Sequence, residues 1–412
     1  MVQQLEIIRD PLWNNIRIDP LALRLVDTRV FQRLRYVRQL GLAYLVYPGA
    51  THSRFEHALG AYHLARRTIA LLDERGELAV VGADECAIVC AAALLHDVGH
   101  YPFSHALEEI GALHHEEVAL PLVTTGEVAE HLREGIAGDA PERVYALMRG
   151  TSQSPLQGLI SGSLDLDKIE YLKRDAFMSG VPYGEIDVDR LTNSLTIVDD
   201  PVTERRAVGV FEKGLSALES LLFAKYQMYR NVYWHHAVRS ATAMYKRTVD
   251  DALRSGSLDH RELVGYTDEG LLHRLDGLGP SPILDALRER RLYKRALDHP
   301  AAELDDVWGE WIAGNRAATV AAEDRIAAAV GLGPGELLLD HPAKPEMLGL
   351  DLPVLRRDGS VGRLTTAGWP AAINLPLLSE QLYRSARRLR VFVARPVTAT
   401  PAEMLRLVEE SA

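Results

Sequence analysis

Apolar residues recur at the spacing of an amphipathic helix through most of residues 20–340 of this 412-residue chain. Five stretches carry the clearest pattern and are expected to form helices: about 55–74, 84–95, 103 onward, 164–177 and 214–249. Gly76, just after the first stretch, and Asp84, as N-cap of the second, are typical of helix ends. We expect the last stretch to run with little or no interruption. The pattern therefore predicts a mainly α fold.

The character of the chain changes towards its C-terminus. Residues 330–370 are richer in glycine and proline, and the alternating run RLRVFVARP (388–396) is typical of a strand. Thr400 and Pro401 are expected to be the N-cap and first residue of a C-terminal helix. The stretch 255–345 carries no motif that we can interpret. We expect three parts: a helical core over 1–250, a helical extension over 251–340 and a small α+β region over 341–412.

Composition limits the partners of the chain. Hydrophobic residues make up 47% and the formal net charge is −11, which disfavours a nucleic-acid coat or an anionic membrane as the main partner. Nucleic acid stays open only as a secondary partner. There is no apolar signal region and no run of eighteen apolar residues, and two cysteines give no disulfide framework. We therefore expect a soluble cytoplasmic protein.

The strongest chemical signal is His96-Asp97, where an apolar helix ends inside ALLHDVGHYPFSH. An imidazole and a carboxylate at such a terminus suit a divalent transition metal. Two ligands are too few for a catalytic site, but His57 lies on the preceding helix and Asp167 on a later one. Two imidazoles and two carboxylates leave coordination positions for water and a phosphate oxygen. The sequence therefore predicts one divalent cation, without choosing among Mn, Fe, Mg, Zn, Co and Ni.

The simpler interpretation of each residue weakens this prediction when the residues are taken singly. A lone histidine in a helix is usually packed or on the surface, and a lone His-Asp dipeptide occurs by chance. The prediction of a metal site depends instead on the joint occurrence of these residues. A histidine, a His-Asp pair and an aspartate follow one another on separate expected helices, and the string GHxPFSH follows His96-Asp97.

This order resembles the HD superfamily of metal phosphohydrolases, and longer strings resemble its branch of deoxynucleoside triphosphate triphosphohydrolases. The resemblance covers roughly residues 8–240. The strings that carry it are DTRVFQRLRYVRQLG (27–41), YPGATHSRFEHALG (47–60), LLHDVGHYPFSHALE (94–108), HHEE (114–117), SLDLDKIEYLKRD (163–175) and YQMYRNVYWHHAVR (226–239). The resemblance implies an HD-domain helical core, with a regulatory-like segment at its N-terminus.

The resemblance also implies roles for residues around the metal. Arg54 would contact the substrate phosphate, although a solvated charge at a helix start is the alternative. His105 would lie beside the scissile phosphate as a general acid or in-line helper, oriented by Glu108, where the family often has aspartate. His100 and His115 would contact phosphates.

Further positions match the family's substrate contacts: Lys168, Tyr171, Asp175, Lys225, Tyr233 and His235. Lys168 would serve a phosphate, and Tyr171 with Asp175 would crowd the 3′ side of a deoxyribose. A core aromatic is the alternative for Tyr171. Lys225 stands where the family often has arginine, so a looser phosphate contact is expected. Tyr233 and His235 would lie near the sugar and base.

Asp27, Gln32 and Arg35 match residues that read an activating guanine nucleotide between subunits. The upstream segment departs from the family, because Glu6 replaces a lysine and Trp13-Asn14-Asn15 replaces an HGH-like turn. A glutamate there would repel a triphosphate, so activation is lost or altered on this interpretation. A helix with a solvated charged face is the alternative.

The resemblance thus implies hydrolysis of a deoxynucleoside triphosphate to deoxynucleoside and inorganic triphosphate, with a homo-oligomer (dimer or tetramer) and an additional Mg accompanying the nucleotide. One alternative is an HD phosphohydrolase acting on another nucleotide: a monophosphate, a signalling nucleotide or a nucleic-acid end. Another is a nucleotide-sensing module, which the presence of all four metal ligands disfavours.

Overall fold

The computed structural model describes residues 5–79, 81–304, 308–342, 351–365, 367–370 and 372–411. The helices before residue 200 are α1 (Pro20–Asp27), α2 (Arg29–Gln32), α3 (Arg54–Glu74), α4 (Ala83–Leu95), α5 (His115–Thr124), α6 (Gly126–Gly135), α7 (Ala140–Met148), α8 (Leu166–Ser179) and α9 (Val188–Ser194). The later helices are α10 (Leu215–Met228), α11 (His236–Arg254), α12 (Asp268–Asp276), α13 (Pro282–Arg288), α14 (Glu310–Gly314), α15 (Arg316–Ala329), α16 (Leu375–Ala386) and α17 (Pro401–Glu409). The mainly α prediction is confirmed.

The strands form three small sheets. They are β1 (Glu6–Asp10), β2 (Asn14–Ile18), β3 (Leu195–Asp199), β4 (Arg206–Phe211), β5 (Lys294–Pro300), β6 (Leu337–Asp340), β7 (Leu352–Leu355), β8 (Val361–Leu364) and β9 (Arg388–Val393). β1 and β2 form an antiparallel hairpin, the second sheet has the order β3-β4-β7-β8, and the third has the order β5-β9-β6. The predicted late strand is therefore present, whereas the N-terminal hairpin was not predicted from the sequence.

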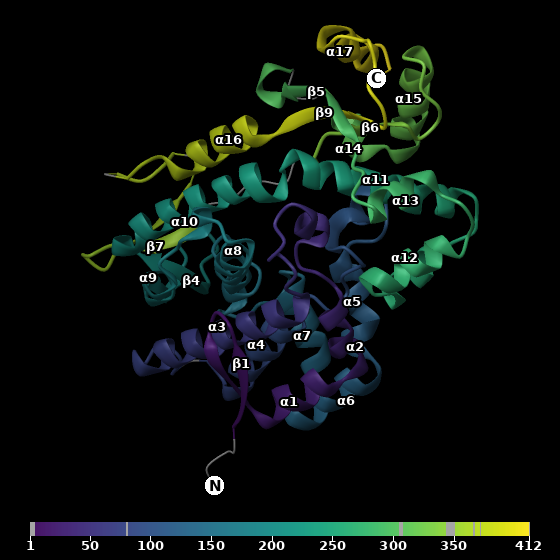
Figure 1. The fold of residues 1–412 in the computed structure, drawn as a ribbon. Helices are drawn as coiled ribbons and strands as arrows, with labels where there is room; N and C mark the ends of the chain where they lie inside the picture. Colours follow the sequence, from purple (N-terminus) through teal and green to yellow (C-terminus); the bar gives the residue numbers. More distant parts are fainter. Residues whose placement is uncertain are drawn as a thin grey trace.

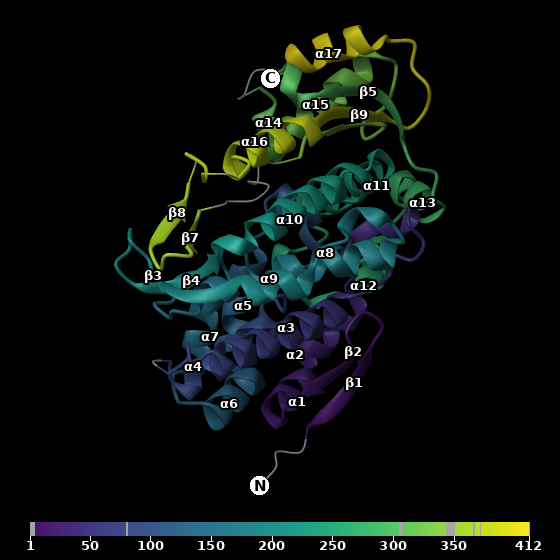
Figure 2. The ribbon, with the colours of Figure 1, turned by 90° about the vertical axis from the view of Figure 1, so that its left-hand side faces the viewer.

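The elements are arranged in layers (Figures 1 and 2). The N-terminal hairpin and helices α1 to α7 form the lower body, and α10 and α11 run across the middle of the molecule. The sheet of β5, β9 and β6 lies above α11, with α15 and α17 packed around it. This arrangement packs α3 against both α4 and α8 in the core.

Local sequence explains why the site-bearing helices begin and end where they do. Ser53 and Glu56 form a capping box at the start of α3, and Gly76 adopts a left-handed φ of 70° just after its end. Asp165 caps α8 by accepting a hydrogen bond from the Lys168 backbone N–H. Thr400 likewise forms a capping box in front of α17, as its sequence predicts.

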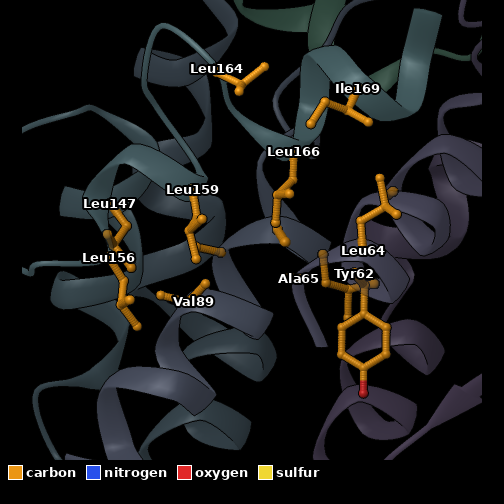
Figure 3. Packing of buried hydrophobic residues seen from close by; sticks show 14 of the residues in the cluster. Tyr62, Leu64, Ala65, Val89, Leu147, Leu156, Leu159, Leu164, Leu166 and Ile169 are labelled. Atoms are coloured by element: carbon orange, nitrogen blue, oxygen red, sulfur yellow. The ribbon is translucent and has the colours of Figure 1, made fainter. Parts of the chain in front are cut away.

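The core that holds these helices is aliphatic (Figure 3). Leu64 and Ala65 of α3, Val89 of α4 and Leu166 and Ile169 of α8 are all buried in one cluster. Burying such side chains stabilises the fold by about 1.5–3 kcal/mol each. The packing therefore sets the spacing between the three helices that carry the predicted metal ligands.

Three expected helix features are wrong. Gly82 occupies the N-cap of α4, and Asp84 lies in its first turn, where a carboxylate still complements the helix dipole. No regular helix starts at Phe103, because Phe103 and Ser104 have left-handed φ angles of 57° and 64° and only short 3-10 turns follow. The expected helix over 214–249 is interrupted by a π-helical turn at Tyr229–Tyr233.

Two sheets join strands from distant parts of the chain. β4 pairs with β7, and β9 lies between β5 and β6. Strands from both sides of residue 341 therefore share sheets, and part of the glycine- and proline-rich stretch, residues 343–350, lies outside the described residues. The three-part division of the chain stays a prediction. Within the described ranges, every helix is too short or too polar to cross a membrane.

Candidate active site

The four predicted metal ligands converge from three helices. His57 lies one turn into α3, His96 and Asp97 follow the end of α4, and Asp167 lies in the first turn of α8. The Nε2 atoms of His57 and His96 are 3.1 Å apart. Asp167 Oδ1 lies 2.9 Å from the first of these atoms and 3.5 Å from the second. The chain thus brings two imidazoles and a carboxylate to one point.

Asp97 faces the same point. Its Oδ1 lies 3.4 Å from His96 Nε2, and its Oδ2 lies 3.6 Å from His57 Nε2. Arg54 Nη1 donates to Asp97 Oδ2 at 2.5 Å. Burial alone would raise the pKa of Asp97, but the Arg54 guanidinium together with His96 and His100 outweighs it and holds that pKa well below its usual range. Asp97 is therefore an ionised carboxylate in a buried site.

Both imidazoles are turned so that Nε2 is the free ligand atom. His57 Nδ1 donates to Glu170 Oε2 at 2.5 Å, and His96 Nδ1 donates to the Ala93 carbonyl at 2.9 Å. Such hydrogen bonds select the tautomer of a metal-ligating histidine. Burial lowers the pKa of His57, but hydrogen bonds with Asp167 and Glu170 raise it overall to about 10. A cation bound there would have to displace that proton.

Glu170 is a functional residue that the sequence reasoning missed. It is fully buried and accepts hydrogen bonds from His57, from Arg174 Nε at 2.7 Å and from Trp13 Nε1 at 2.9 Å. Gly60 leaves room for it, since a Cβ there would lie 1.9 Å from Glu170 Oε1. The i+3 spacing from Asp167 along one helix was the available signal. Trp13 belongs to the segment that departs from the family, so this departure reaches a residue that contacts the candidate ligand His57.

A second polar cluster lies beside the first. It contains His100, His105, Glu108 and His115, whose ligand atoms all lie within 4.8 Å of one another. Glu108 accepts from His115 Nδ1 at 2.8 Å, and its other oxygen lies 3.3 Å from His105 Nδ1. His105 is exposed, whereas His100 is buried and lies 3.1 Å from Asp97 Oδ1 through Nδ1. The predicted general acid and its orienting carboxylate are thus adjacent.

A strained loop positions this cluster. Phe103 and Ser104 are consecutive non-glycine residues in the left-handed region, which costs about 1–3 kcal/mol each. Ser104 Oγ accepts from Arg54 Nε at 3.1 Å and donates to the Arg38 carbonyl at 2.7 Å. Asp268, from the stretch without a motif, accepts from the Phe103 N–H at 2.8 Å. Tertiary contacts therefore hold the backbone that carries His105.

Lys168 follows Asp167 in α8, and Lys225 of α10 is close enough to interact electrostatically with both residues. Lys168 forms an ion pair with Asp165 and donates to the Gly162 carbonyl. Lys225 is buried; burial and the neighbouring Lys168 charge lower its pKa to about 8. Two cations near the first turn of α8 suit a polyanion, as the sequence predicts.

The other predicted substrate contacts form two groups: Tyr171, Asp175 and Tyr233 make up the first, and His235 is the second. Tyr171 is half-buried with its ring 6.4 Å from that of His57, whereas Asp175 is buried and accepts from Tyr233 at 2.7 Å and from His52 at 2.8 Å. His235 lines a cavity of about 210 Å³ that none of the four metal ligands lines. Burial, with neighbouring cationic groups, lowers the pKa of His235 to about 4.

The three predicted nucleotide-reading residues lie on the surface around α1 and α2. Asp27 is exposed, Gln32 donates to the Val26 carbonyl at 2.8 Å, and Arg35 Nε donates to Gln32 Oε1 at 2.8 Å. The Arg35 guanidinium also stacks 3.5 Å above the Phe55 ring. These residues neighbour one another, and their regulatory role stays a prediction.

The donor set fits a divalent cation. His57, His96 and Asp97 form a group whose ligand atoms lie within 4.8 Å of one another, and Asp167 approaches both imidazoles. Nitrogen and carboxylate donors in equal number suit a transition metal without selecting one.

Comparisons with protein families agree with this geometry. Residues 54–150 match the HD domain, and residues 186–368 match the HD associated region. The chain carries an HD domain followed by an HD-associated region. The HD-domain match spans Arg54, three of the metal-ligand candidates and the second cluster. Asp167 lies between the two matched segments.

Several curated proteins are similar to this HD-domain chain. The uncharacterized protein MJ1154 of Methanocaldococcus jannaschii is 33% identical over 309 residues, covering 75% of this chain and 63% of that protein. The uncharacterized protein YwfO of Bacillus subtilis is 34% identical over 250 residues, covering 60% and 56%. The deoxynucleoside triphosphate triphosphohydrolase SAMHD1 homolog of Dictyostelium discoideum is 27% identical over 315 residues, covering 70% and 59%. The alignment spans less than two thirds of each relative.

Two solved structures share the fold over nearly the whole HD-domain chain. A phosphohydrolase from Bacteroides thetaiotaomicron has a TM-score of 0.73 at 24% identity, covering 95% of this chain and 100% of that one. A hypothetical protein from Aquifex aeolicus has a TM-score of 0.71 at 27% identity, covering 99% of both chains. The architecture, including the C-terminal sheets, therefore recurs in other chains.

Proposed function

We propose that this protein is a metal-dependent phosphohydrolase that converts a deoxynucleoside triphosphate to a deoxynucleoside and inorganic triphosphate. The observation that carries the proposal is the meeting of the His57 and His96 Nε2 atoms with Asp97 and Asp167, directly beside the cluster of His105 and Glu108. The Dictyostelium relative, which is named as a deoxynucleoside triphosphate triphosphohydrolase, supports the choice of substrate.

When bound by His57, His96, Asp97 and Asp167, a divalent cation supplies a Lewis acid for a phosphoryl oxygen and lowers the pKa of water. Arg54, which lies against Asp97, can place positive charge on the α-phosphate.

The protein's own groups can then complete the displacement. The oxygen of water joins the α-phosphorus while the bond from that phosphorus to the 5′ oxygen breaks. His105, held by Glu108, is exposed and can donate a proton to the departing 5′ oxygen. His100, His115, Lys168 and Lys225 would contact the phosphates.

Tyr171, Asp175 and Tyr233 would set the preference for the sugar. Asp175 holds the Tyr233 hydroxyl, and Tyr171 lies one turn beyond Asp167 on α8. A half-buried aromatic ring at this place would leave no room for a 2′-hydroxyl. His235 would act from the neighbouring cavity, at the base end of the nucleotide.

The test is to incubate the purified protein with each of the four dNTPs, singly and mixed, with Mn or Mg, and to identify products by chromatography. We expect deoxynucleoside and inorganic triphosphate in equal amounts. Turnover only in mixtures, or only with added dGTP, would support a guanine-nucleotide site at Asp27, Gln32 and Arg35.

The controls are protein stripped of metal and the exposed variant His273→Asn. Release of monophosphate or pyrophosphate would contradict the proposed reaction. Turnover confined to monophosphates, signalling nucleotides or nucleic-acid ends would favour the alternative substrate class. Binding of nucleotides without any turnover would favour a sensing module.

A further inference from the structure

The second cluster has the composition of a metal site in its own right. Three imidazoles and one carboxylate, from His100, His105, His115 and Glu108, place one ligand atom each within 4.8 Å of all the others. The rings of His100 and His115 are stacked with centroids 3.7 Å apart, and the His105 ring lies 4.8 Å from that of His100. Three imidazoles and a carboxylate are a common donor set for zinc and related cations.

One ligand atom in this cluster is buried and unpartnered. His100 is 1% exposed, and its Nδ1 faces Asp97 Oδ1, while its Nε2 has no hydrogen-bond partner. A buried polar atom without a partner costs about 1–3 kcal/mol, so such an atom usually marks a missing ligand or water. A cation coordinated by Nε2 would satisfy it.

Glu108 already gathers the other donors. Its Oε1 accepts from His115 Nδ1 at 2.8 Å, and its Oε2 lies 3.3 Å from His105 Nδ1. Ligands around zinc lie about 2.0–2.2 Å from the ion, so the four atoms need to contract only modestly. His105 is exposed and can rotate, whereas His115 is held by the start of α5.

We propose that His100, His105, Glu108 and His115 form a second transition-metal site, and that its occupation by a zinc-like cation switches hydrolysis off. The proposal that a cation binds here depends only on the geometry of the cluster. The proposal that this cation stops turnover rests on the proposed function. A His105 coordinated through one nitrogen cannot form the imidazolium that would donate a proton to the departing oxygen. The cation also occupies the place where phosphate would meet His100 and His115.

The test begins with binding of Zn²⁺ alone. Metal-stripped protein is dialysed against increasing Zn²⁺, and bound zinc is measured by elemental analysis. We expect two equivalents per chain, falling to one in Glu108→Gln and in His105→Asn. Circular dichroism and the thermal midpoint in the absence of metal confirm that each variant is folded. Binding of Co²⁺ should give the visible absorption of a tetrahedral site, lost in the same variants.

Turnover is then measured with Mn²⁺ fixed and Zn²⁺ titrated. We expect about a 100-fold loss as the second equivalent binds, because a general acid contributes about 10²–10⁴ to rate. A chelator that removes only this equivalent should restore activity. His273→Asn, an exposed histidine outside both clusters, should keep two equivalents and the same inhibition.

The outcomes separate the two proposals. A second equivalent lost in Glu108→Gln, in a protein that hydrolyses no dNTP, supports the site and overturns the proposed function. If the protein hydrolyses dNTPs but binds only one equivalent of zinc per chain at every Zn²⁺ concentration, the second site is overturned. A second equivalent that survives in Glu108→Gln but is lost in His114→Asn also overturns it, since the cation would then belong to the exposed group of His114, His115 and Glu116.

Discussion

At the scale of single residues, the proposed metal site depends on groups that lie behind the candidate ligands. Glu170 fixes the tautomer of His57 and is itself held by Arg174 and Trp13. Arg174 reaches further, to Asp10 at the end of β1. A buried charge is tolerated only when paired, and here two carboxylates share one guanidinium. The N-terminal hairpin is therefore connected through Glu170 to His57, a candidate metal ligand, by a chain of hydrogen bonds.

Glu170→Gln should weaken metal binding by about 10–100-fold, because the amide provides a weaker acceptor for His57 Nδ1–H. The measurement is competition with a chelator of known affinity. Glu74→Gln, at the exposed end of α3, should change nothing. Unchanged affinity in Glu170→Gln would show that this carboxylate does not orient the ligand.

Asp167→Ala should abolish metal binding at the first site and hydrolysis, while leaving the helical fold. Elemental analysis and circular dichroism measure the two effects separately. The exposed Asp73→Ala is the matched control. Hydrolysis at the parental rate by Asp167→Ala would contradict the proposed ligand set.

The lowered pKa of Lys225 leads us to expect that kcat/KM for a dNTP depends on pH. Because burial and Lys168 lower its pKa to about 8, its positive charge is present below that pH and lost as pH rises through it. The value of kcat/KM for a dNTP should therefore fall above about pH 8. Lys225→Arg should remove this fall, because arginine stays protonated. The exposed Lys213→Arg should retain it.

At the scale of elements, close approach of backbones brings the two clusters together. Gly99 separates Asp97 from His100 and packs against the start of α5, where a Cβ would lie 2.0 Å from the His115 carbonyl oxygen. The position of α5, and with it His115, therefore depends on a residue without a side chain.

Gly99→Ala should move α5 away and lower stability by about 1–3 kcal/mol, as overpacking does. Thermal unfolding measures the loss, and the second zinc equivalent should weaken with it. In Gly138→Ala, an added Cβ meets nothing within 4 Å, so both properties should be unchanged. Equal stability of the two variants would mean that α5 is not held by this contact.

At the scale of the whole molecule, the C-terminal strands tie distant segments together. β7 extends the sheet of β3 and β4, which follows the HD domain, and β9 is the central strand between β5 and β6. Removing a central strand leaves two edges unpaired. The expected α+β region over 341–412 is therefore joined through sheets to earlier residues.

A chain ending at residue 340 should consequently unfold at a lower temperature than the full chain and aggregate. Differential scanning calorimetry and size-exclusion chromatography test this. An unchanged unfolding midpoint would instead support an independent C-terminal unit, as the three-part division predicts.

Local sequence was enough to predict the helices that bear the site, the end of α3 before Gly76, the N-cap of the C-terminal helix at Thr400, and the order of the four metal-ligand candidates, because periodicity and capping act over a few residues. It could not reveal that Glu170 meets Trp13, that Asp268 holds the Phe103 loop, or that β7 pairs with β4. Those contacts join residues 157, 165 and about 140 positions apart, and nothing in local spacing specifies them. The donor types at the metal centre follow from the sequence, whereas their tautomers and charges were decided by tertiary packing, since burial and hydrogen bonding determine both.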